Sequence, residues 1–145
     1  MQGSAGCGKS TLIKAIYQSV VQALGPQAIE VVAPTGAAAF NIEGKTIHSL
    51  LRIGNTKEYV ELTPEKQKRF RNEMKDVKFI IVDEMSMVGA KLLHYIDKRC
   101  REAKYDPETL LHEEPFGGIF IYMFGDFRQL PPVLDKALYS ESNAS

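Results

Sequence analysis

Apolar residues recur along this chain in patterns that alternate between helical and strand periods. Near the N-terminus they repeat at helical spacing, at Leu12, Ile13, Ile16, Val20, Val21 and Leu24. This predicts a helix from about Lys9 that ends before Gly25-Pro26. The β-branched run at 28–33 then predicts a short strand ended by Pro34.

The same alternation continues toward the C-terminus. Residues 35–51 predict a turn and two short helical pieces broken at Gly44. Thr63-Pro64-Glu65 supplies an N-cap, a proline at the first helical position and an acid in the first turn, which predicts a charged surface helix over about 63–77.

Two apolar runs predict inner strands of a sheet. Residues 78–82 (KFIIV) and 119–124 (IFIYMF) are continuous and apolar, as in buried parallel strands. Between them, apolar residues at helical spacing predict another helix, at Met85, Val88, Leu92, Ile96 and Cys100. The order of elements predicts an α/β fold with a mostly parallel sheet and helices on both faces.

The motif with the clearest chemistry is Gly3-Ser4-Ala5-Gly6-Cys7-Gly8-Lys9-Ser10, followed by Thr11. It has the G-x-x-x-x-G-K-[ST] spacing of a phosphate-binding loop. The glycines let backbone N–H groups turn toward nucleotide phosphates, Lys9 can reach the β- and γ-phosphates, and the Ser10 hydroxyl can ligate Mg²⁺. Only Met1 and Gln2 precede the motif, so we expect the fold to lack the strand that normally leads into such a loop.

Acidic residues follow the strand at 78–82, where open parallel sheets place their ligands. Asp83 is a candidate Mg²⁺ ligand, and Glu84 is a candidate for activating the attacking water in nucleotide hydrolysis. The alternative is that the two acids cap the next helix. After the second inner strand, Gln129 carries a donor and an acceptor that could sense the γ-phosphate, or it could simply face water.

Composition excludes little. The 18 basic and 18 acidic residues cancel, so bulk charge does not indicate a nucleic-acid partner, although a local basic face stays possible. No apolar stretch approaches a membrane span. Two cysteines, Cys7 and Cys100, form no disulfide framework or metal spacing, which favours an intracellular compartment. His94 and His112 are interpreted as surface residues.

Five motifs together resemble one family. In order along the chain they are GSAGCGKS, APTGAAAFNIEGKTIHSL, IIVDEMSMV, PFGGI and GDFRQLPPV. Their order and spacing resemble superfamily-1 DNA helicases of the 5′-to-3′ branch, most of all the petite-integration-frequency family and its transposon-borne relatives. The resemblance runs from Gln2 to about Val133 and implies a RecA-like P-loop NTPase fold.

The resemblance also implies roles for residues that match the motifs. Lys9, Ser10 and Thr11 correspond to the phosphate and Mg²⁺ contacts, Asp83 and Glu84 to the acid pair, and Gln129 to the γ-phosphate sensor. In such helicases, single-stranded DNA lies against two further segments, which here comprise Pro34, Thr35, Gly36, Thr46, Ile47, His48 and Ser49. Small hydroxyls suit phosphate oxygens, and His48 can stack on a base or donate a hydrogen bond. A buried structural histidine is the alternative for His48, and Phe40 is expected in the core.

The sequence departs from the family in its extent. It lacks the strand and glutamine segment before the phosphate loop, and the second RecA-like domain with its arginine across the cleft. We interpret residues 1–134 as a partial N-terminal motor domain and 135–145 as a polar tail, and we expect this part by itself to hydrolyse ATP weakly and to unwind no DNA. The resemblance implies an ATP- and Mg²⁺-dependent 5′-to-3′ helicase acting in DNA repair, recombination or genome maintenance, in the nucleus or mitochondrion of a eukaryote. A standalone nucleotide-binding ATPase or switch is the alternative, and an inactive remnant is a third reading.

Overall fold

The computed structural model describes residues 2–125, with side chains described from residue 11 onward. Four parallel strands form one sheet in the order β2-β1-β3-β4. The strands are β1 (Ile29–Ala33), β2 (Lys45–Thr46), β3 (Phe79–Val82) and β4 (Phe120–Met123). The α/β fold with a parallel sheet is confirmed, and β2, which the sequence patterns did not predict, is added to it.

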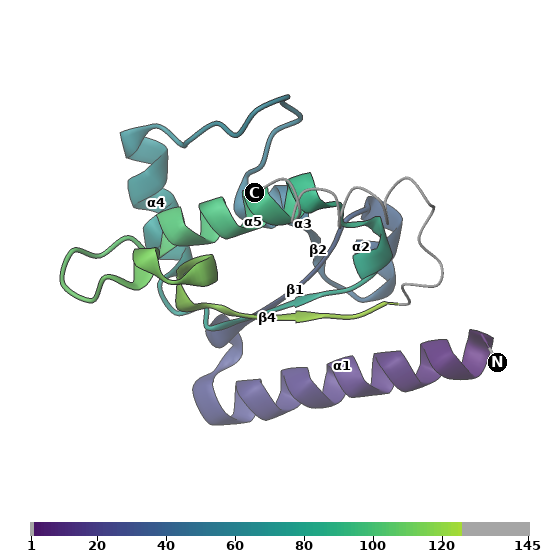
Figure 1. Ribbon diagram of the computed structural model, residues 1–145. Coiled ribbons are helices and arrows are strands. Elements are labelled where there is room, and N and C mark those ends of the chain that lie inside the picture. Colours follow the sequence, from purple (N-terminus) through teal and green to yellow (C-terminus); the bar gives the residue numbers. More distant parts are fainter. Residues whose placement is uncertain (1, 126–145) are drawn as a thin grey trace.

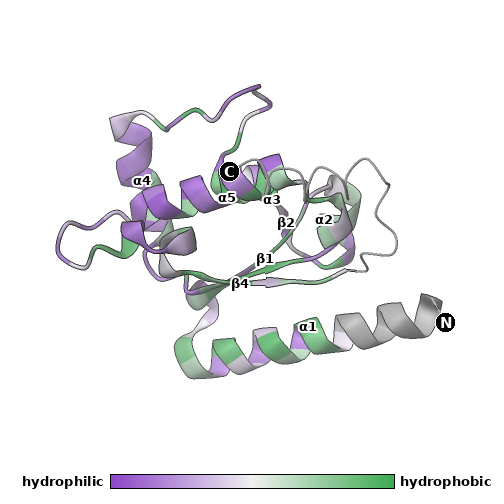
Figure 2. Cartoon of the chain, viewed as in Figure 1, coloured by the Kyte–Doolittle hydropathy of each residue, from purple (hydrophilic) through white to green (hydrophobic). Residues whose placement is uncertain are grey.

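Helices cover both faces of the sheet (Figure 1). Helix α1 (Gln2–Leu24) covers one face, where Ile13 and Val20 pack with Ile29 and Ile81. The opposite face carries α3 (Ile47–Leu51), α4 (Pro64–Met74) and α5 (Ala90–Ala103). The larger core lies on this second face, and the strands between the layers are mainly hydrophobic whereas α4 is mainly hydrophilic (Figure 2).

Short helical turns connect these elements. They are η1 (Pro26–Ala28), α2 (Gly36–Asn41), η2 (Met85–Met87), η3 (Leu111–Glu113) and η4 (Pro115–Gly118). The predicted helix through Met85 therefore begins only at Ala90, because Met85–Met87 form a separate 3-10 turn. The predicted N-cap at Thr63 is confirmed, since its hydroxyl accepts a hydrogen bond from the Lys66 N–H at 3.4 Å.

The PFGGI motif forms the turn that leads from α5 into β4. Phe116, Gly117 and Gly118 all have positive φ, and the Phe116 N–H donates to Asp97 Oδ1 on α5 at 2.6 Å. A side chain at Gly117 would overlap the carbonyl group of Cys100. Glycine is therefore required where this turn crosses the backbone of α5.

Two burial predictions are wrong. Phe40 was expected in the core but is 83% exposed, because Ala39 is the residue of the short helix α2 that turns inward. The run 119–124 was expected to be a buried strand, but β4 is the edge of the described sheet and Phe120 is 61% exposed. Phe120 and Tyr122 instead stack with Phe79, at centroid distances of 5.4 and 6.1 Å.

Candidate nucleotide and nucleic-acid site

The candidate residues from three strands meet at one edge of the sheet. Ala33 is opposite Thr46 in the β1–β2 pair, and Val82 is opposite both Val32 and Met123. Because all four strands are parallel, the segments that follow them leave the sheet at the same, carboxyl edge. The acid pair after β3 therefore lies between the segment 34–36 after β1 and the segment 124–125 after β4.

The acid pair is held by backbone hydrogen bonds to both neighbouring strands. The Asp83 N–H donates to Val32 O at 2.9 Å, and the Met85 N–H donates to Phe124 O at 2.8 Å. Asp83 is 4% exposed, whereas Glu84 is half-buried and has the left-handed backbone angles φ 58° and ψ 48°. The left-handed conformation of Glu84 changes the direction of the backbone immediately after β3. Such backbone strain is typical of functional positions.

The alternative was that these acids cap the following helix; Glu84 is the N-cap residue of η2 by position, but its side chain makes no cap hydrogen bond there. Helix α5 begins at Ala90 and its N-cap is Gly89, five residues after Glu84. The carboxylates are instead positioned at the end of the central strand β3. A carboxylate at this position is the donor type that Mg²⁺ accepts alongside substrate phosphates. In the part of the chain from 11 to 125, no group of three or more His, Cys, Asp or Glu side chains gathers at metal-binding distance, and a Mg²⁺–nucleotide site does not require one.

The two threonines of the candidate DNA segments share one local role. Thr35 Oγ1 accepts from the Ala38 N–H at 3.2 Å and caps α2, and Thr46 Oγ1 accepts from the Ser49 N–H at 3.0 Å and caps α3. A hydroxyl that accepts such a bond keeps its own proton to donate. Both threonines can therefore hold a helix end and contact a phosphate oxygen at the same time.

The other residues of these segments are at least partly exposed, except Ile47, which is buried. Gly36, His48 and Ser49 are exposed, and Pro34 and Thr46 are half-buried. The buried-histidine alternative for His48 is therefore wrong. Its carbonyl oxygen, however, is engaged, because it accepts from the N–H groups of Arg52 and Ile53. The backbone of α3 is thus fixed while the His48 side chain faces outward.

The phosphate-loop motif has a different local structure from the one predicted. Residues 3–8 were expected to form a loop before a helix from about Lys9, but α1 is continuous from Gln2. Helical backbone satisfies its N–H and C=O groups through local hydrogen bonds, and the non-glycine residues of the motif tolerate it. The N-terminal end of α1 still lies on the side of the molecule where the strands have their carboxyl ends (Figure 1).

A comparison with protein families identifies the family of this chain. The model of the PIF1-like helicase family matches residues 1–145. The chain belongs to this family. Two curated relatives are similar to it: the ATP-dependent DNA helicase RRM3 of Saccharomyces cerevisiae, 35% identical over 92% of this chain, and the ATP-dependent DNA helicase PIF1 of Xenopus laevis, 40% identical over 90%. The chain spans about a fifth of each relative, 18% and 19%.

Solved structures of PIF1 helicases share its fold. The Bacteroides Pif1 bound to single-stranded DNA superposes with a TM-score of 0.63 at 31% identity, covering 94% of this chain and 30% of that protein. The Bacteroides Pif1 complex with ADP-AlF4 gives a TM-score of 0.64 at 33% identity, covering 94% and 30%. The RecA-like fold predicted from the motifs is thus confirmed for this family member.

Several predicted site residues have side chains outside the described ones. This holds for Lys9, Ser10 and the rest of the motif at 3–10, and Gln129 lies beyond residue 125, as does the predicted tail at 135–145. Their assignments stay predictions. Of the other histidines, His94 is exposed as predicted, whereas His112 is half-buried and its ring packs on Tyr105 at 4.6 Å.

Sequence patterns did not single out Arg99, which is 3% exposed and makes four hydrogen bonds. The available signal was its spacing from Glu102, an opposite charge three residues later on the same helix. Arg99 also adjoins the apolar stripe of α5, next to the buried Cys100. A charge beside such a stripe indicates an ion pair in the core, because lone buried charges are avoided.

We expect the two cysteines to differ strongly in reactivity. Cys100 is buried, and burial, with Asp97 nearby, raises the pKa of its thiol to about 12. At pH 8 the reactive thiolate of Cys100 is therefore scarce. Cys7 belongs to the predicted phosphate-binding motif and lies two residues before Lys9 in the sequence, and a cationic neighbour favours a reactive thiol.

Timed alkylation with iodoacetamide, followed by mass spectrometry of each peptide, measures this difference. Cys7 should react at least roughly tenfold faster than Cys100, and bound nucleotide should protect it. Cys7→Thr should remove the sensitivity of nucleotide binding to alkylation while keeping the binding. Equal, slow labelling of both thiols would show that Cys7 has no electropositive surroundings.

Proposed function

We propose that this chain is the N-terminal RecA-like motor domain of an ATP-dependent DNA helicase that moves 5′-to-3′ on single-stranded DNA. The observation that supports this most is the meeting, at one edge of the sheet, of an acid pair for nucleotide chemistry with two hydroxyl-bearing segments for a DNA strand. A nucleotide switch without motor activity has no need for the second feature. The family membership supports the same assignment.

In this proposal, the chain's own residues divide the work. Lys9 of the motif at 3–10 binds the phosphates, together with the first N–H groups of α1, which have no partner within the helix. Ser10 and Asp83 hold Mg²⁺, which supplies charge neutralisation at the β- and γ-phosphates. Glu84 orients and deprotonates the attacking water, and Gln129 senses the γ-phosphate. The burial of Asp83 at the end of β3 suits a metal ligand that must stay fixed while phosphates exchange.

The DNA strand is proposed to run across the segments 34–36 and 46–49. The first begins directly after Ala33 of β1 and the second begins at Thr46, the partner of Ala33 in β2, so a phosphate backbone can cross both. Translocation requires a second domain that closes on nucleotide, so we assign stepping to the larger protein and binding to this domain.

We further propose a role in DNA repair or recombination, in the nucleus or mitochondrion of a eukaryotic host. From residue 2 to residue 125, no helix combines the length and apolarity needed to cross a bilayer.

The test uses substitutions that keep the helix caps but repel phosphate. Aspartate caps helices about as well as threonine, so Thr35→Asp and Thr46→Asp should preserve stability. We expect each to weaken binding of a fluorescein-labelled oligothymidylate by about tenfold in anisotropy titrations at low salt. The wild-type chain should prefer the single strand to a duplex of equal length.

Thr63→Asp is the matched control. Thr63 caps α4, which lies at the other end of the molecule from α2 (Figure 1), so this variant carries the same substitution in the same role. It should bind the oligonucleotide as the wild type does. Equal affinities for Thr46→Asp and Thr63→Asp, or no preference for the single strand, would rule out the proposed DNA path.

A further inference from the structure

We propose that Arg99 is a positioning residue for single-strand binding, which holds helix α3 in place through the carbonyl groups at its C-terminal end. The inference rests on the proposed contact of Thr46, His48 and Ser49 with DNA. It assigns a role to a buried charge on α5 that makes no contact with the proposed site itself.

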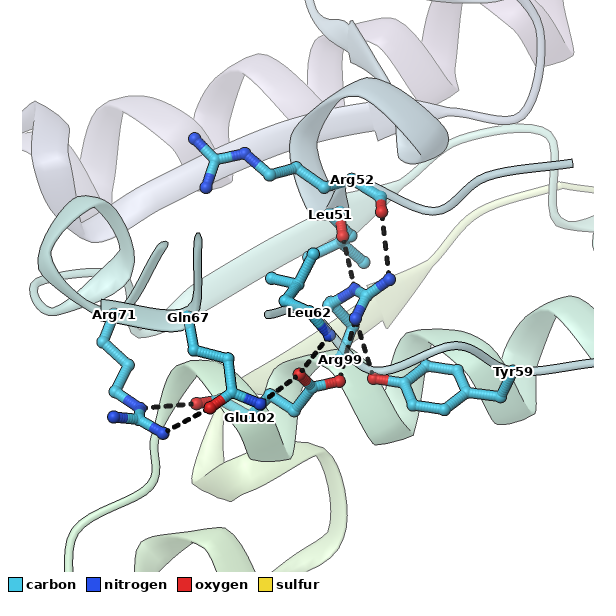
Figure 3. Close-up of polar contacts among 8 residues, drawn as sticks. All are labelled: Leu51, Arg52, Tyr59, Leu62, Gln67, Arg71, Arg99 and Glu102. Carbon is cyan, nitrogen blue, oxygen red and sulfur yellow. Dashed lines mark hydrogen bonds and ion pairs between the residues drawn. The ribbon is translucent and has the colours of Figure 1, made fainter. Parts of the chain in front are cut away.

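The contact of Arg99 with α3 is direct and directional (Figure 3). Its Nε donates to Leu51 O at 2.8 Å, and its Nη2 donates to Arg52 O at 3.0 Å. The last carbonyls of a helix have no partner within the helix. The planar guanidinium fork therefore completes the hydrogen bonding of the C-terminal turn of α3, where Arg52 ends the helix with left-handed backbone angles.

The remaining Arg99 donor is held by two other parts of the fold. Nη1 donates to Glu102 Oε2 at 2.8 Å and to the Tyr59 hydroxyl at 3.1 Å, and the guanidinium lies over the Tyr59 ring at 5.0 Å. Glu102 Oε1 in turn accepts from the Leu62 N–H at 3.2 Å and from Gln67 Nε2 at 3.1 Å. Arg99 thus joins α3 to α5, to the segment 53–63 and, through Glu102, to α4 (Figure 3).

Helix α3 needs such an external restraint because it has only five residues. A helix this short is unstable by itself, so its orientation comes from tertiary contacts. Ile47 and Leu51 anchor its inner side, Thr46 caps its first turn and Arg99 fixes its last turn. The His48 carbonyl accepts from the N–H groups of Arg52 and Ile53, so freeing the C-terminal turn also releases the backbone of a proposed DNA-contacting residue.

The geometry cannot be reproduced by a lysine. Burial lowers the pKa of Arg99 and raises that of Glu102, so each needs its charged partner. Arg99→Lys keeps a positive charge beside Glu102 but lacks the fork that reaches Leu51 O and Arg52 O together. Arg99→Lys therefore tests the hydrogen bonds to α3 separately from the positive charge.

The test compares Arg99→Lys and Arg99→Met with the control Arg71→Met. Arg71 belongs to the same network, since it donates to Glu102 O at 3.3 Å and Gln67 Oε1 at 3.1 Å and packs over Tyr105, but these contacts join α4 to α5. We expect both Arg99 variants to lose about tenfold in affinity for the labelled oligothymidylate, and Arg71→Met to stay within about twofold of wild type. Affinity for a fluorescent ATP analogue should be unchanged in Arg99→Lys.

Amide hydrogen exchange distinguishes a local effect on α3 from a general loss of stability, because a general loss would accelerate exchange throughout the protein. In Arg99→Lys, the amides of Arg52 and Ile53 should exchange faster, while that of Asp83, bonded to Val32 O, should keep its wild-type rate. Uniform acceleration would overturn the inference. So would a folded Arg99→Lys that binds DNA as the wild type does, or unfolding of both Arg99 variants by circular dichroism.

Failure of the proposed function has a different signature. In that case the wild-type chain shows no preference for single strands, or Thr46→Asp binds as Thr63→Asp does, and the inference falls with the function. If the wild type and Thr46→Asp behave as proposed and only the Arg99 variants match wild type, the function stands and the positioning role of Arg99 is wrong.

Discussion

Glu84→Gln is expected to lower the rate of ATP hydrolysis by roughly 10²–10⁴-fold while leaving nucleotide binding intact. The carboxylate is proposed to take a proton from the attacking water, which matters only once the reaction begins. Glutamine keeps the size of the side chain and its hydrogen-bonding capacity but not the basicity. The half-buried position of Glu84, directly after the end of β3, suits a base that acts on a water beside the phosphates.

Lys9→Ala should have the opposite profile, because Lys9 is proposed to contact the phosphates in the bound state. Binding of a fluorescent ATP analogue with Mg²⁺ should disappear for Lys9→Ala and persist for Glu84→Gln. Single-turnover hydrolysis of radiolabelled ATP then separates binding from chemistry. Loss of binding in Glu84→Gln would contradict the role assigned to this residue.

Glu43→Gln is the matched control for Glu84→Gln. Glu43 also has left-handed backbone angles, with φ 56° against 58° for Glu84. It precedes β2, however, and so does not follow the carboxyl end of a strand as Glu84 does. We expect Glu43→Gln to hydrolyse ATP at the wild-type rate, which would show that the effect at Glu84 does not arise from the substitution or its backbone conformation.

Gly44→Ala should lower the free energy of unfolding by about 3 kcal/mol or more. A methyl group at Gly44 would overlap the carbonyl oxygen of Val31 in β1 and lie 3.0 Å from its carbonyl carbon. Neither backbone can move without disturbing the β1–β2 pairing, which aligns the segments that begin at Pro34 and Ile47. Urea unfolding followed by circular dichroism measures the change.

Gly36→Ala provides the comparison for that experiment. A methyl group at Gly36 has no neighbour within 4 Å, and the residue opens helix α2. Alanine loses less entropy than glycine on entering a helix, so stability should stay the same or rise by up to about 1 kcal/mol. Equal destabilisation by both substitutions would show that close packing against Val31 is not what requires glycine at position 44.

Local sequence patterns predicted most of the secondary structure. The runs at 28–33 and 78–82 became β1 and β3, and the break at Gly44 separates two short helices as predicted. The Thr63-Pro64-Glu65 cap also formed, because a threonine hydroxyl and a proline at N1 act within one turn of the chain. Such features depend on neighbours in sequence, and a sequence displays them directly.

Burial at the sheet edge was not predictable in this way. The run 119–124 is as apolar as 78–82, yet β3 lies between two strands and β4 has a neighbour on one side within the described sheet. Strand order decides which apolar run is covered, and strand order is a relation between distant segments. The exposure of Phe40 and Phe120 follows from their places at the margins of the fold.

The candidate site likewise has features that local sequence encodes and features that depend on tertiary packing. By itself, the sequence determined the acid pair, the hydroxyl segments and the family, because each is a motif with fixed local spacing. Only the tertiary structure decided that the segments 34–36 and 46–49 lie at the same edge of the sheet as Asp83, through the parallel register of β1, β2 and β3. It alone decided that Arg99 caps α3 from 47 and 48 residues away. A hydrogen bond over that separation depends on how helices pack, which no local pattern encodes.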